Sequence, residues 1–152
     1  MIIKAKENQV NIVREITQRT ICEVYPQYYP AGAVEFFREH HNDVNIMKDI
    51  KNEIVFLLLD QEQYVGTVTI KNNEICRLFV LPEFQHHGYG RKLMEYAEEN
   101  ISSTYSEIVL DASLPAKNIY KLRGYTETEY RKILTEFGDY LCYDVMKKKC
   151  NC

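Results

Sequence analysis

No long apolar run occurs in this sequence. Its apolar stretches fall far short of the roughly eighteen consecutive residues that a membrane-spanning helix needs. The N-terminus, from Met1 to Lys4, also lacks the long apolar core of a secretory signal peptide. We therefore expect a cytoplasmic protein without a membrane partner.

A surplus of positive charge is also missing. The chain carries 19 lysines and arginines against 22 aspartates and glutamates, which gives a formal net charge of -3. Proteins that bind nucleic acid usually present a basic face to the phosphates. The composition therefore argues against a nucleic-acid partner, and the run from Lys147 to Lys149 is typical of a solvated tail.

Cysteine is present, but without paired C-x-x-C spacing. An odd, scattered set predicts neither a disulfide framework nor a structural zinc site, so we interpret the cysteines as reduced thiols. The five are Cys22, Cys76, Cys142, Cys150 and Cys152.

The 152 residues, 45% of them hydrophobic, are enough for one compact core and too few for two ordinary ones. We predict a single domain over residues 1–152. A first strand at residues 2–5 precedes a helix that starts at Asn8 as N-cap and runs to about Glu23. Two prolines then interrupt the helix. The later expected elements are helices at 32–40, 93–101 and 115–122, and strands at 54–59, 64–70, 74–81, 108–110, 125–134 and 140–146.

The segment from Gln85 to Arg91 lies between a predicted strand and a predicted helix. Backbone N–H groups and the helix dipole converge on an anion at such a junction. Gly88 and Gly90 remove side chains that would keep a diphosphate away from the backbone. The segment has neither the Rossmann glycine pattern nor the P-loop lysine, so it predicts another kind of phosphate site.

Two signatures in this region resemble those of the GNAT superfamily of N-acetyltransferases. Residues 78–91 resemble the pattern V-x-P-x-[YF]-[QR]-x-x-G-x-G-[RK], and residues 113–125 resemble N-x-x-A-x-x-x-Y-x-x-x-G-[FY]. Together the two matches cover about residues 74–125. One departure is Ser113, which stands where the second signature usually has asparagine, and we expect it to alter a cofactor contact.

The resemblance implies a mixed α/β fold with a central, mostly antiparallel sheet and helices on both faces. One parallel strand pair splays, usually at a bulge, and leaves a cleft for the pantetheine arm of acetyl-CoA. The amides of residues 86–91 then bind the CoA pyrophosphate. The implied cofactor-binding residues are Leu78, Phe79, Val80, Gln85, His86, His87, Gly88, Tyr89, Gly90, Arg91, Ser113 and Ala116.

Acetyl transfer to an amine sets three chemical requirements. A free alkyl ammonium with a pKa near ~10.4 is neutral only about 0.04% of the time at pH 7, so a base or an acidified substrate is needed. The oxyanion needs an N–H donor, which Phe79 or Val80 can supply. The departing thiolate benefits from an acid.

Tyr120 is the candidate acid, because it matches the tyrosine of the second signature and a phenol of pKa about 10 stays protonated at neutral pH. The alternative is an aromatic residue that packs its helix against the sheet. Glu74 is the candidate base, since its spacing to Gln85 resembles that of the base in the superfamily's histone acetyltransferases. Its alternative is an exposed carboxylate at a strand end.

Other reactive side chains are given structural roles. Adjacent His86 and His87 point to different sides and have no Asp or Cys at ligand spacing, so we expect no metal ion and assign them backbone contacts with phosphate. Cys76 beside Ile75 is typical of packing rather than of an acyl-enzyme. Aromatic residues that either line an amine pocket or belong to the core are Tyr25, Tyr28, Tyr29, Phe36, Phe37 and Tyr130.

The sequence thus predicts an enzyme that moves the acetyl group of acetyl-CoA to a primary amine, in a ternary complex. A small-molecule amine is favoured because no extra module for a polypeptide is visible. Three alternatives stay open: a protein N-acetyltransferase, a CoA-binding sensor or scaffold without turnover, and a general nucleotide-binding domain. The resemblance allows a homodimer, but the sequence does not specify the oligomeric state.

Overall fold

A computed structural model describes residues 1–150 and shows one mixed sheet of seven strands in the order β1-β2-β3-β4-β5-β7-β6. All neighbouring strands are antiparallel except β4 and β5. The predicted fold class is confirmed. The strands are β1 Ile2–Lys4, β2 Val55–Asp60, β3 Gln63–Lys71, β4 Glu74–Val80, β5 Glu107–Ala112, β6 Thr126–Leu134 and β7 Tyr140–Lys149. The helices are α1 Val10–Val24, α2 Ala31–His40, α3 Asp43–Lys51, α4 Tyr89–Ser102 and α5 Lys117–Leu122.

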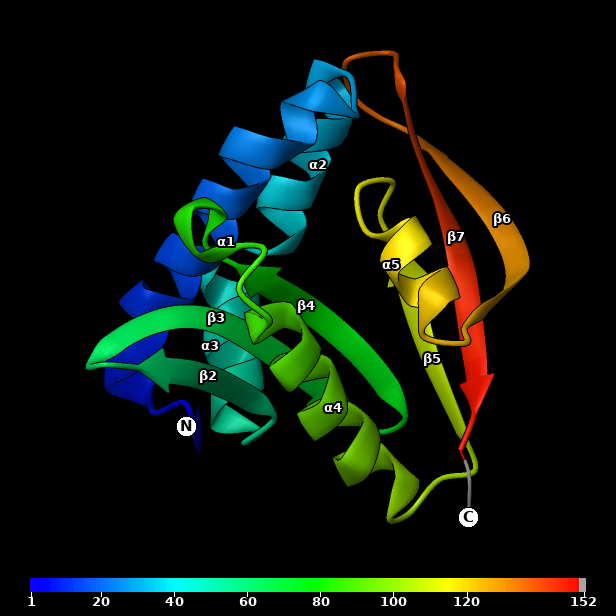
Figure 1. The fold of residues 1–152 in the computed structure, drawn as a ribbon. Coiled ribbons are helices and arrows are strands. Elements are labelled where there is room, and N and C mark those ends of the chain that lie inside the picture. Colours follow the sequence, from blue (N-terminus) through cyan, green and yellow to red (C-terminus); the bar gives the residue numbers. More distant parts are fainter. Residues whose placement is uncertain (151–152) are drawn as a thin grey trace.

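Helices cover both faces of the sheet (Figure 1). Helices α1, α2 and α3 bury their apolar sides with Val55, Leu57 and Phe79. Helices α4 and α5 bury theirs with Ile75 and Leu110 from the middle strands. Because successive strand residues point to opposite faces, β4 contributes to both layers of the core.

The start of α1 differs from the prediction. Asn8 lies inside a short 3-10 turn, η1 (Glu7–Gln9), and α1 begins at Val10 with Gln9 as its N-cap. The Lys6 N–H donates to the Gln9 side chain at 2.9 Å, and this contact closes the turn ahead of the helix. The N-cap prediction for Asn8 was therefore wrong.

Helix α3 was not predicted at all. Its local signals are present: the Asn42 side chain accepts a bond from the Asn45 N–H at 2.9 Å, as an N-cap does. Ile46 and Ile50, one turn apart, are both buried against the sheet. The helix matters for the site because it also carries Asp49.

The parallel strands β4 and β5 touch only near one end. Glu74 pairs with Val109 and Ile75 with Leu110, and no further pair forms along the two strands. Beyond Ile75 the strands diverge, as Figure 1 shows. The sheet is therefore split into a part with β1–β4 and a part with β5–β7, as the resemblance implied.

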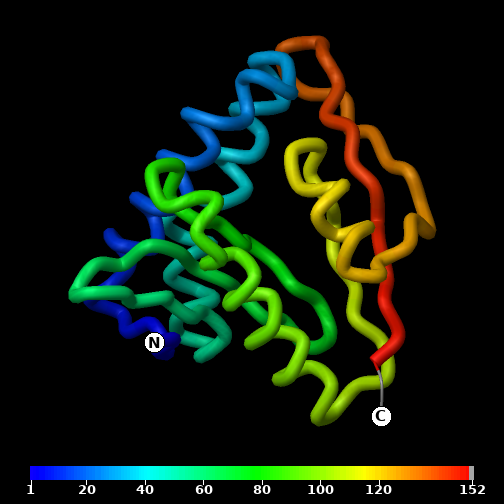
Figure 2. The backbone as a smooth tube through the Cα atoms, in the orientation of Figure 1, coloured from blue at the N-terminus to red at the C-terminus, as the bar shows by residue number. Residues whose placement is uncertain are grey.

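Side-chain contacts join the two parts at both ends of the opening. At the end where α2 approaches the β6–β7 turn (Figure 2), the Gly32 N–H donates to Asp139 at 2.9 Å, and the Leu114 N–H donates to the Tyr29 hydroxyl at 2.7 Å. On the α4 side, Glu98 accepts bonds from groups that follow α5 or lie on β7. These donors are Arg123, Tyr125 at 3.1 Å and Lys148 at 3.1 Å.

Glu98→Gln is expected to lower the free energy of unfolding by about 2 kcal/mol at pH 7, since it leaves partly buried cations without their counter-charge. Burial alone would raise the pKa of Glu98, but Arg123 and Lys148 outweigh it and lower the pKa. The carboxylate therefore stabilises the fold above the ordinary carboxyl pKa and loses this effect as the pH falls through its lowered pKa. Urea unfolding at pH 7 and at acidic pH should show that the difference in unfolding free energy between wild type and variant shrinks in acid.

Glu107→Gln is the control for Glu98→Gln, because Glu107 makes an exposed pair with Lys147 at 3.4 Å. Such a pair contributes about 0.5 kcal/mol or less. Equal losses in the two variants would contradict the assigned role of Glu98.

Candidate active site

The turn between β4 and α4 presents a row of unpaired backbone N–H groups. The chain passes through a short 3-10 turn, η3 (Pro82–Phe84), and then through left-handed conformations at His86 (φ +65°) and Gly88 (φ +84°). The first bond of α4 runs from Lys92 N–H to Gly88 O at 3.1 Å. Within residues 1–150, no amide from His86 to Arg91 donates to a protein acceptor. These amides and the N-terminus of α4 form an arrangement that suits a phosphate.

Side chains of the turn brace it rather than fill it. The Gln85 amide donates to Val80 O at 3.0 Å, and His87 Nδ1 donates to Gln85 O at 2.7 Å. Tyr89 donates its hydroxyl to Asp60 at the end of β2, a contact that the sequence did not reveal. Arg91 is exposed and pairs with Glu95 at 3.0 Å. The turn therefore offers its backbone to a ligand while its side chains fix its shape.

The register of β4 determines which backbone groups face the opening. Leu81 N–H donates to Val65 O on β3 at 2.9 Å. Every second residue of an antiparallel strand bonds to the same neighbour, so Phe79, which pairs with Thr67, also directs its N–H to β3. The amides between these positions, those of Leu78 and Val80, point to the other edge of β4. Of the two predicted oxyanion donors, Val80 therefore has its N–H toward β5, and Phe79 does not.

A bulge sets this register. From Thr69 to Thr67 the partner strand advances by two residues, whereas β4 advances by three, from Cys76 to Phe79. Arg77 is the bulged residue, and its φ of +43° lies in the left-handed region. The predicted bulge is therefore present on β4.

Tyr120 lies in α5 and is 8% exposed, with its ring 5.9 Å from that of Tyr125. Burial, and to a lesser degree Tyr25, raises the pKa of Tyr120 above its ordinary value. The phenol therefore keeps its proton at neutral pH, as an acid must before it acts. The hydroxyl has no hydrogen-bond partner in the part of the chain that the structure describes.

Ser113 lies where a tyrosine reaches across the opening. Burial raises the pKa of Tyr25 to about 12, and the side chain of Ser113 beside it opposes the rise. Tyr25 comes from η2 (Tyr25–Gln27), which follows α1, a helix packed on the part of the sheet with β1–β4. Ala116 immediately precedes α5, and its N–H donates to Ser113 O at 3.1 Å. Ser113 and Tyr25 thus bring the two parts of the sheet together at this point.

Glu74 is half-buried at the start of β4. Burial raises the pKa of Glu74, and the nearby carboxylate of Asp111 raises it further. Burial also raises the pKa of the neighbouring Cys76 thiol to about 12. A thiol with that pKa is not a nucleophile at neutral pH, in agreement with a packing role for Cys76.

The candidate acid and base lie on opposite faces of the sheet. Tyr120 packs with Ile75 in the core layer under α4 and α5. Glu74 precedes Ile75 in the strand, so its side chain points to the face covered by α1, α2 and α3. Only a substrate that passes through the opening between β4 and β5 can contact both groups.

A histidine missed by the sequence analysis also borders this region. His41 follows α2, and its ring lies edge-on to Phe79 at 5.7 Å. Burial, with Arg77 beside it, lowers the pKa of His41 to about 3, so the ring is neutral. Because Arg77 Nε donates to His41 Nδ1 at 3.2 Å, the ring proton must be on Nε2. His41 can thus donate a hydrogen bond but cannot act as a base.

The aromatic residues considered for an amine pocket divide between core and surface. Tyr25, Tyr29 and Phe37 form a buried or partly buried cluster whose ring centroids lie 4.8 to 5.6 Å apart. Tyr28 and Tyr130 are 48% and 63% exposed. The core interpretation therefore applies to the first three.

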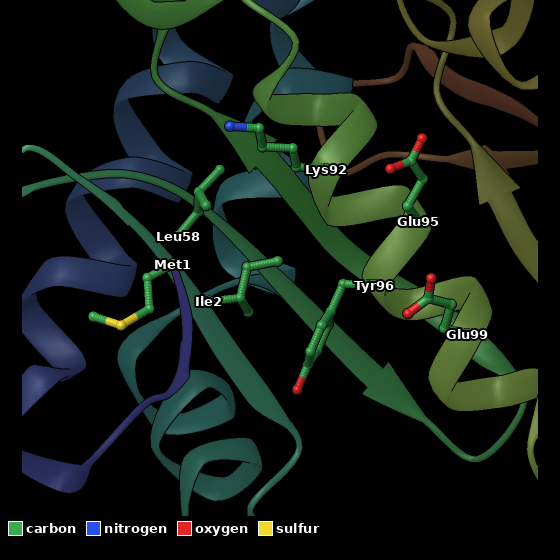
Figure 3. A pocket seen from close by; sticks show the side chains of 7 residues that line it. All are labelled: Met1, Ile2, Leu58, Lys92, Glu95, Tyr96 and Glu99. Atoms are coloured by element: carbon green, nitrogen blue, oxygen red, sulfur yellow. The ribbon is translucent and has the colours of Figure 1, made fainter.

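A separate cavity of about 390 Å³ lies between α4 and strands β1 and β2, at the far end of the sheet from β5 (Figure 3). None of the predicted site residues lines it. Its lining residues are Met1, Ile2, Leu58, Lys92, Glu95, Tyr96 and Glu99.

No helix among residues 1–150 has the length and apolar character needed to cross a membrane.

Over the same residues, no group of three or more His, Cys, Asp or Glu side chains is placed to hold a metal ion. Cys22, Cys76, Cys142 and Cys150 form no disulfide, and Cys152 lies outside the described residues.

The split sheet and the phosphate-type turn define a class of CoA-dependent acyltransferase folds, and sequence comparison agrees. A family model described as "Acetyltransferase (GNAT) domain" matches residues 24–136, well over half of the chain. The chain belongs to the GNAT acetyltransferase family. A comparison with curated proteins finds no match.

Solved structures share the fold at low sequence identity. A GCN5-related N-acetyltransferase from Rhodopseudomonas palustris has a TM-score of 0.89 and 17% identity, covering 98% of this chain and 94% of that one. The PaiA N-acetyltransferase of Thermoplasma acidophilum, solved with coenzyme A, has a TM-score of 0.73, 18% identity and 98% coverage of both chains. A ribosomal-protein-alanine N-acetyltransferase from Brucella melitensis has a TM-score of 0.70 and 14% identity, covering 98% of this chain and 99% of that one.

Proposed function

We propose that this protein is a cytoplasmic enzyme of one domain that transfers the acetyl group of acetyl-CoA to the primary amine of a small molecule. The observation that carries the proposal is the opening between β4 and β5, with free amides along one edge and a protonated phenol, Tyr120, beside it. An extended thioester can enter such an opening and meet a nucleophile from the other face of the sheet.

The cofactor is held mainly by backbone groups. The amides from His86 to Arg91 bind the pyrophosphate, since both negative charge and geometry suit a helix N-terminus. The free edge of β4 at Leu78 and Val80 pairs with the pantetheine arm as a neighbouring strand would. The Val80 N–H then stabilises the oxyanion that forms on the thioester carbonyl.

The reaction proceeds by direct attack in a ternary complex and uses no metal ion. Glu74, directly or through water, removes a proton from the acceptor ammonium, and the neutral nitrogen attacks the thioester carbon. The C–N bond forms, the C–S bond breaks, and Tyr120 gives its proton to the departing thiolate. The nitrogen then loses a second proton, which restores the Tyr120 phenol, and Glu74 releases the first proton to solvent. The products are the acetylated amine, CoA and one proton.

A small acceptor is favoured because the opening is bounded where α2 meets the β6–β7 turn. There Asp139 accepts a bond from the Gly32 N–H at 2.9 Å, and Thr135 donates to Asp139 at 2.5 Å. The second candidate is a protein N-acetyltransferase, the activity named for the Brucella melitensis neighbour. CoA release measured with polyamines, amino acids, aminoglycosides and N-terminal peptides separates the two, and turnover with peptides alone would overturn the small-molecule proposal.

A CoA-binding sensor without turnover is the remaining alternative from another class. Acetyl-CoA binding without CoA release above hydrolysis, for every amine tested, would favour it. A thermal-shift comparison tests the general nucleotide-binding interpretation, which requires ATP or NAD to compete with CoA equally well. Light scattering of the protein as it elutes from a size-exclusion column gives the oligomeric state and tests for a homodimer.

Glu74→Gln is expected to lower kcat/KM about 100-fold and to flatten the acidic limb of its pH profile. A base acts only when deprotonated, so activity in the wild type rises with pH through a pKa above the ordinary glutamate value. Asp111→Asn removes the like charge that raises this pKa and should move the limb to lower pH. Initial-rate measurements from pH 5 to 9 check both shifts.

Glu107→Gln serves as the control for the Glu74 variant, since Glu107 lies on neighbouring β5 in an exposed pair with Lys147. Its pH profile should match the wild type. An unchanged acidic limb in Glu74→Gln would remove the base assignment and leave the rest of the proposal in place.

A further inference from the structure

Arg77 is a buried charged side chain that the proposed mechanism does not use. Its side chain is 5% exposed, and its guanidinium donates to three elements at once. Nη1 bonds Thr69 Oγ1 on β3 at 3.0 Å, and Nη2 bonds Asp49 Oδ2 on α3 at 2.9 Å. Nε bonds His41 Nδ1 after α2 at 3.2 Å. A planar fork with this many fixed partners holds its own backbone in one place.

That backbone is the bulge of β4. In the left-handed conformation a non-glycine residue costs about 1–2 kcal/mol, so the bulge at Arg77 persists only where its surroundings hold it. No glycine is present at this position to relieve the cost. The three hydrogen bonds of the guanidinium are the contacts that can offset it.

The bulge decides which amides of β4 face the opening. In a regular strand the direction of the backbone amides would alternate without interruption from Ile75, whose amide faces β5. The amides of Arg77 and Phe79 would then face the opening. The extra residue shifts the alternation by one, so that Leu78 and Val80 face the opening and Phe79 joins the β3 ladder. The side chains shift as well, with Phe79 packed under α1 and Val80 under α4.

We infer that Arg77, held by Asp49 and His41, is a positioning residue that sets the register of β4 and thereby aims the Val80 amide at the reacting carbonyl. The inference rests on the proposed acetyl transfer and assigns that reaction a residue outside the opening. It predicts a specific defect. Arg77 variants misplace the oxyanion donor, while the separate turn of residues 86–91 still binds CoA.

The test compares Arg77→Met and Arg77→Lys with Ile46→Val. Ile46 is fully buried on α3, the helix that carries Asp49, but it does not contact the guanidinium network through a polar group. Loss or misplacement of one oxyanion donor reduces kcat about 100-fold. We expect that loss in Arg77→Met and about 10-fold in Arg77→Lys, which keeps the charge but cannot reach three partners. The Kd for CoA should rise about tenfold at most in both, because the pantetheine arm loses its pairing at Leu78 and Val80 while the pyrophosphate site is independent.

A second measurement does not depend on turnover. In ¹⁵N-labelled protein, Arg77→Lys should shift the amide resonances of Leu78, Phe79 and Val80, whereas Ile46→Val should leave them near their wild-type positions. Resonances in Arg77→Lys that match those of Ile46→Val would overturn the inference, and so would a kcat loss that Ile46→Val reproduces at equal Tm. If the wild type binds acetyl-CoA but acetylates no amine, the proposed function fails, and the resonance shifts still decide whether Arg77 sets the register.

Discussion

Replacing Gly88 with valine is expected to weaken CoA binding at least about 100-fold. Gly88 adopts a φ of +84°, which a β-branched residue disfavours strongly, so the turn must change its backbone conformation. Hydrogen bonds to charged groups contribute about 1.5–3 kcal/mol each, and losing two of them at the pyrophosphate gives a change of this size. Isothermal titration with CoA measures it.

Gly138→Val is a matched control for this prediction. Gly138 also has a φ of +84°, and a Cβ at either glycine would meet no other atom within 4 Å. The two substitutions therefore impose similar backbone strain, but Gly138 lies in the β6–β7 turn, far along the chain from residues 86–91. Equal losses of CoA affinity in the two variants would show that strain alone weakens binding, and would remove the turn from the proposed site.

Tyr120→Phe is expected to lower kcat about 100-fold and to leave the Kd for CoA and the Tm nearly unchanged. The substitution removes only the hydroxyl, whose proton the leaving thiolate would receive, and general acids contribute 10²–10⁴ in rate. The ring keeps its packing in the core under α4 and α5. Because burial raises the pKa of Tyr120, its deprotonation should not limit the rate at pH 9 or below.

Tyr125→Phe provides the comparison for Tyr120→Phe. Its ring packs against Tyr120, but its hydroxyl donates to Glu98 at 3.1 Å, so its loss should reduce stability rather than kcat. A leaving group of low basicity makes the acid less important. A Tyr120 dependence that disappears with more acidic thioester leaving groups would support the assignment, and a normal kcat with acetyl-CoA in Tyr120→Phe would refute it.

Local patterns in the sequence were sufficient for most of the fold. The apolar run at residues 54–59, the turns that follow it and the glycine-containing junction before α4 all lie within a few residues of the structure they specify. The failures were also local. Asn8 has the chemistry of an N-cap, but a 3-10 turn closed by Gln9 precedes the helix. Helix α3 has its N-cap and its buried isoleucines, but it is short and follows α2 closely.

The site was predictable only where one segment forms it. The turn at residues 86–91 follows from contiguous residues, and the signature containing Tyr120 is also continuous. Arg77 is 28 residues from Asp49 and 36 from His41, so no local pattern links them. No glycine marks the bulge, and two of the three hydrogen bonds of the Arg77 side chain span 28 and 36 residues. The placement of Glu74 and Tyr120 on opposite faces likewise depends on the tertiary fold.

The bare edge of β4 lies between two neighbouring strands rather than at the rim of the sheet. A strand with unpaired N–H and C=O groups at the rim can recruit another polypeptide, which is a common route to aggregation. Here β3 covers one side of the strand and β5 bounds the gap on the other, so an extended molecule must thread in rather than dock from outside. The interior position thus selects ligands by their width. A narrow extended chain can form main-chain hydrogen bonds with β4, whereas a β-strand of another protein cannot reach it.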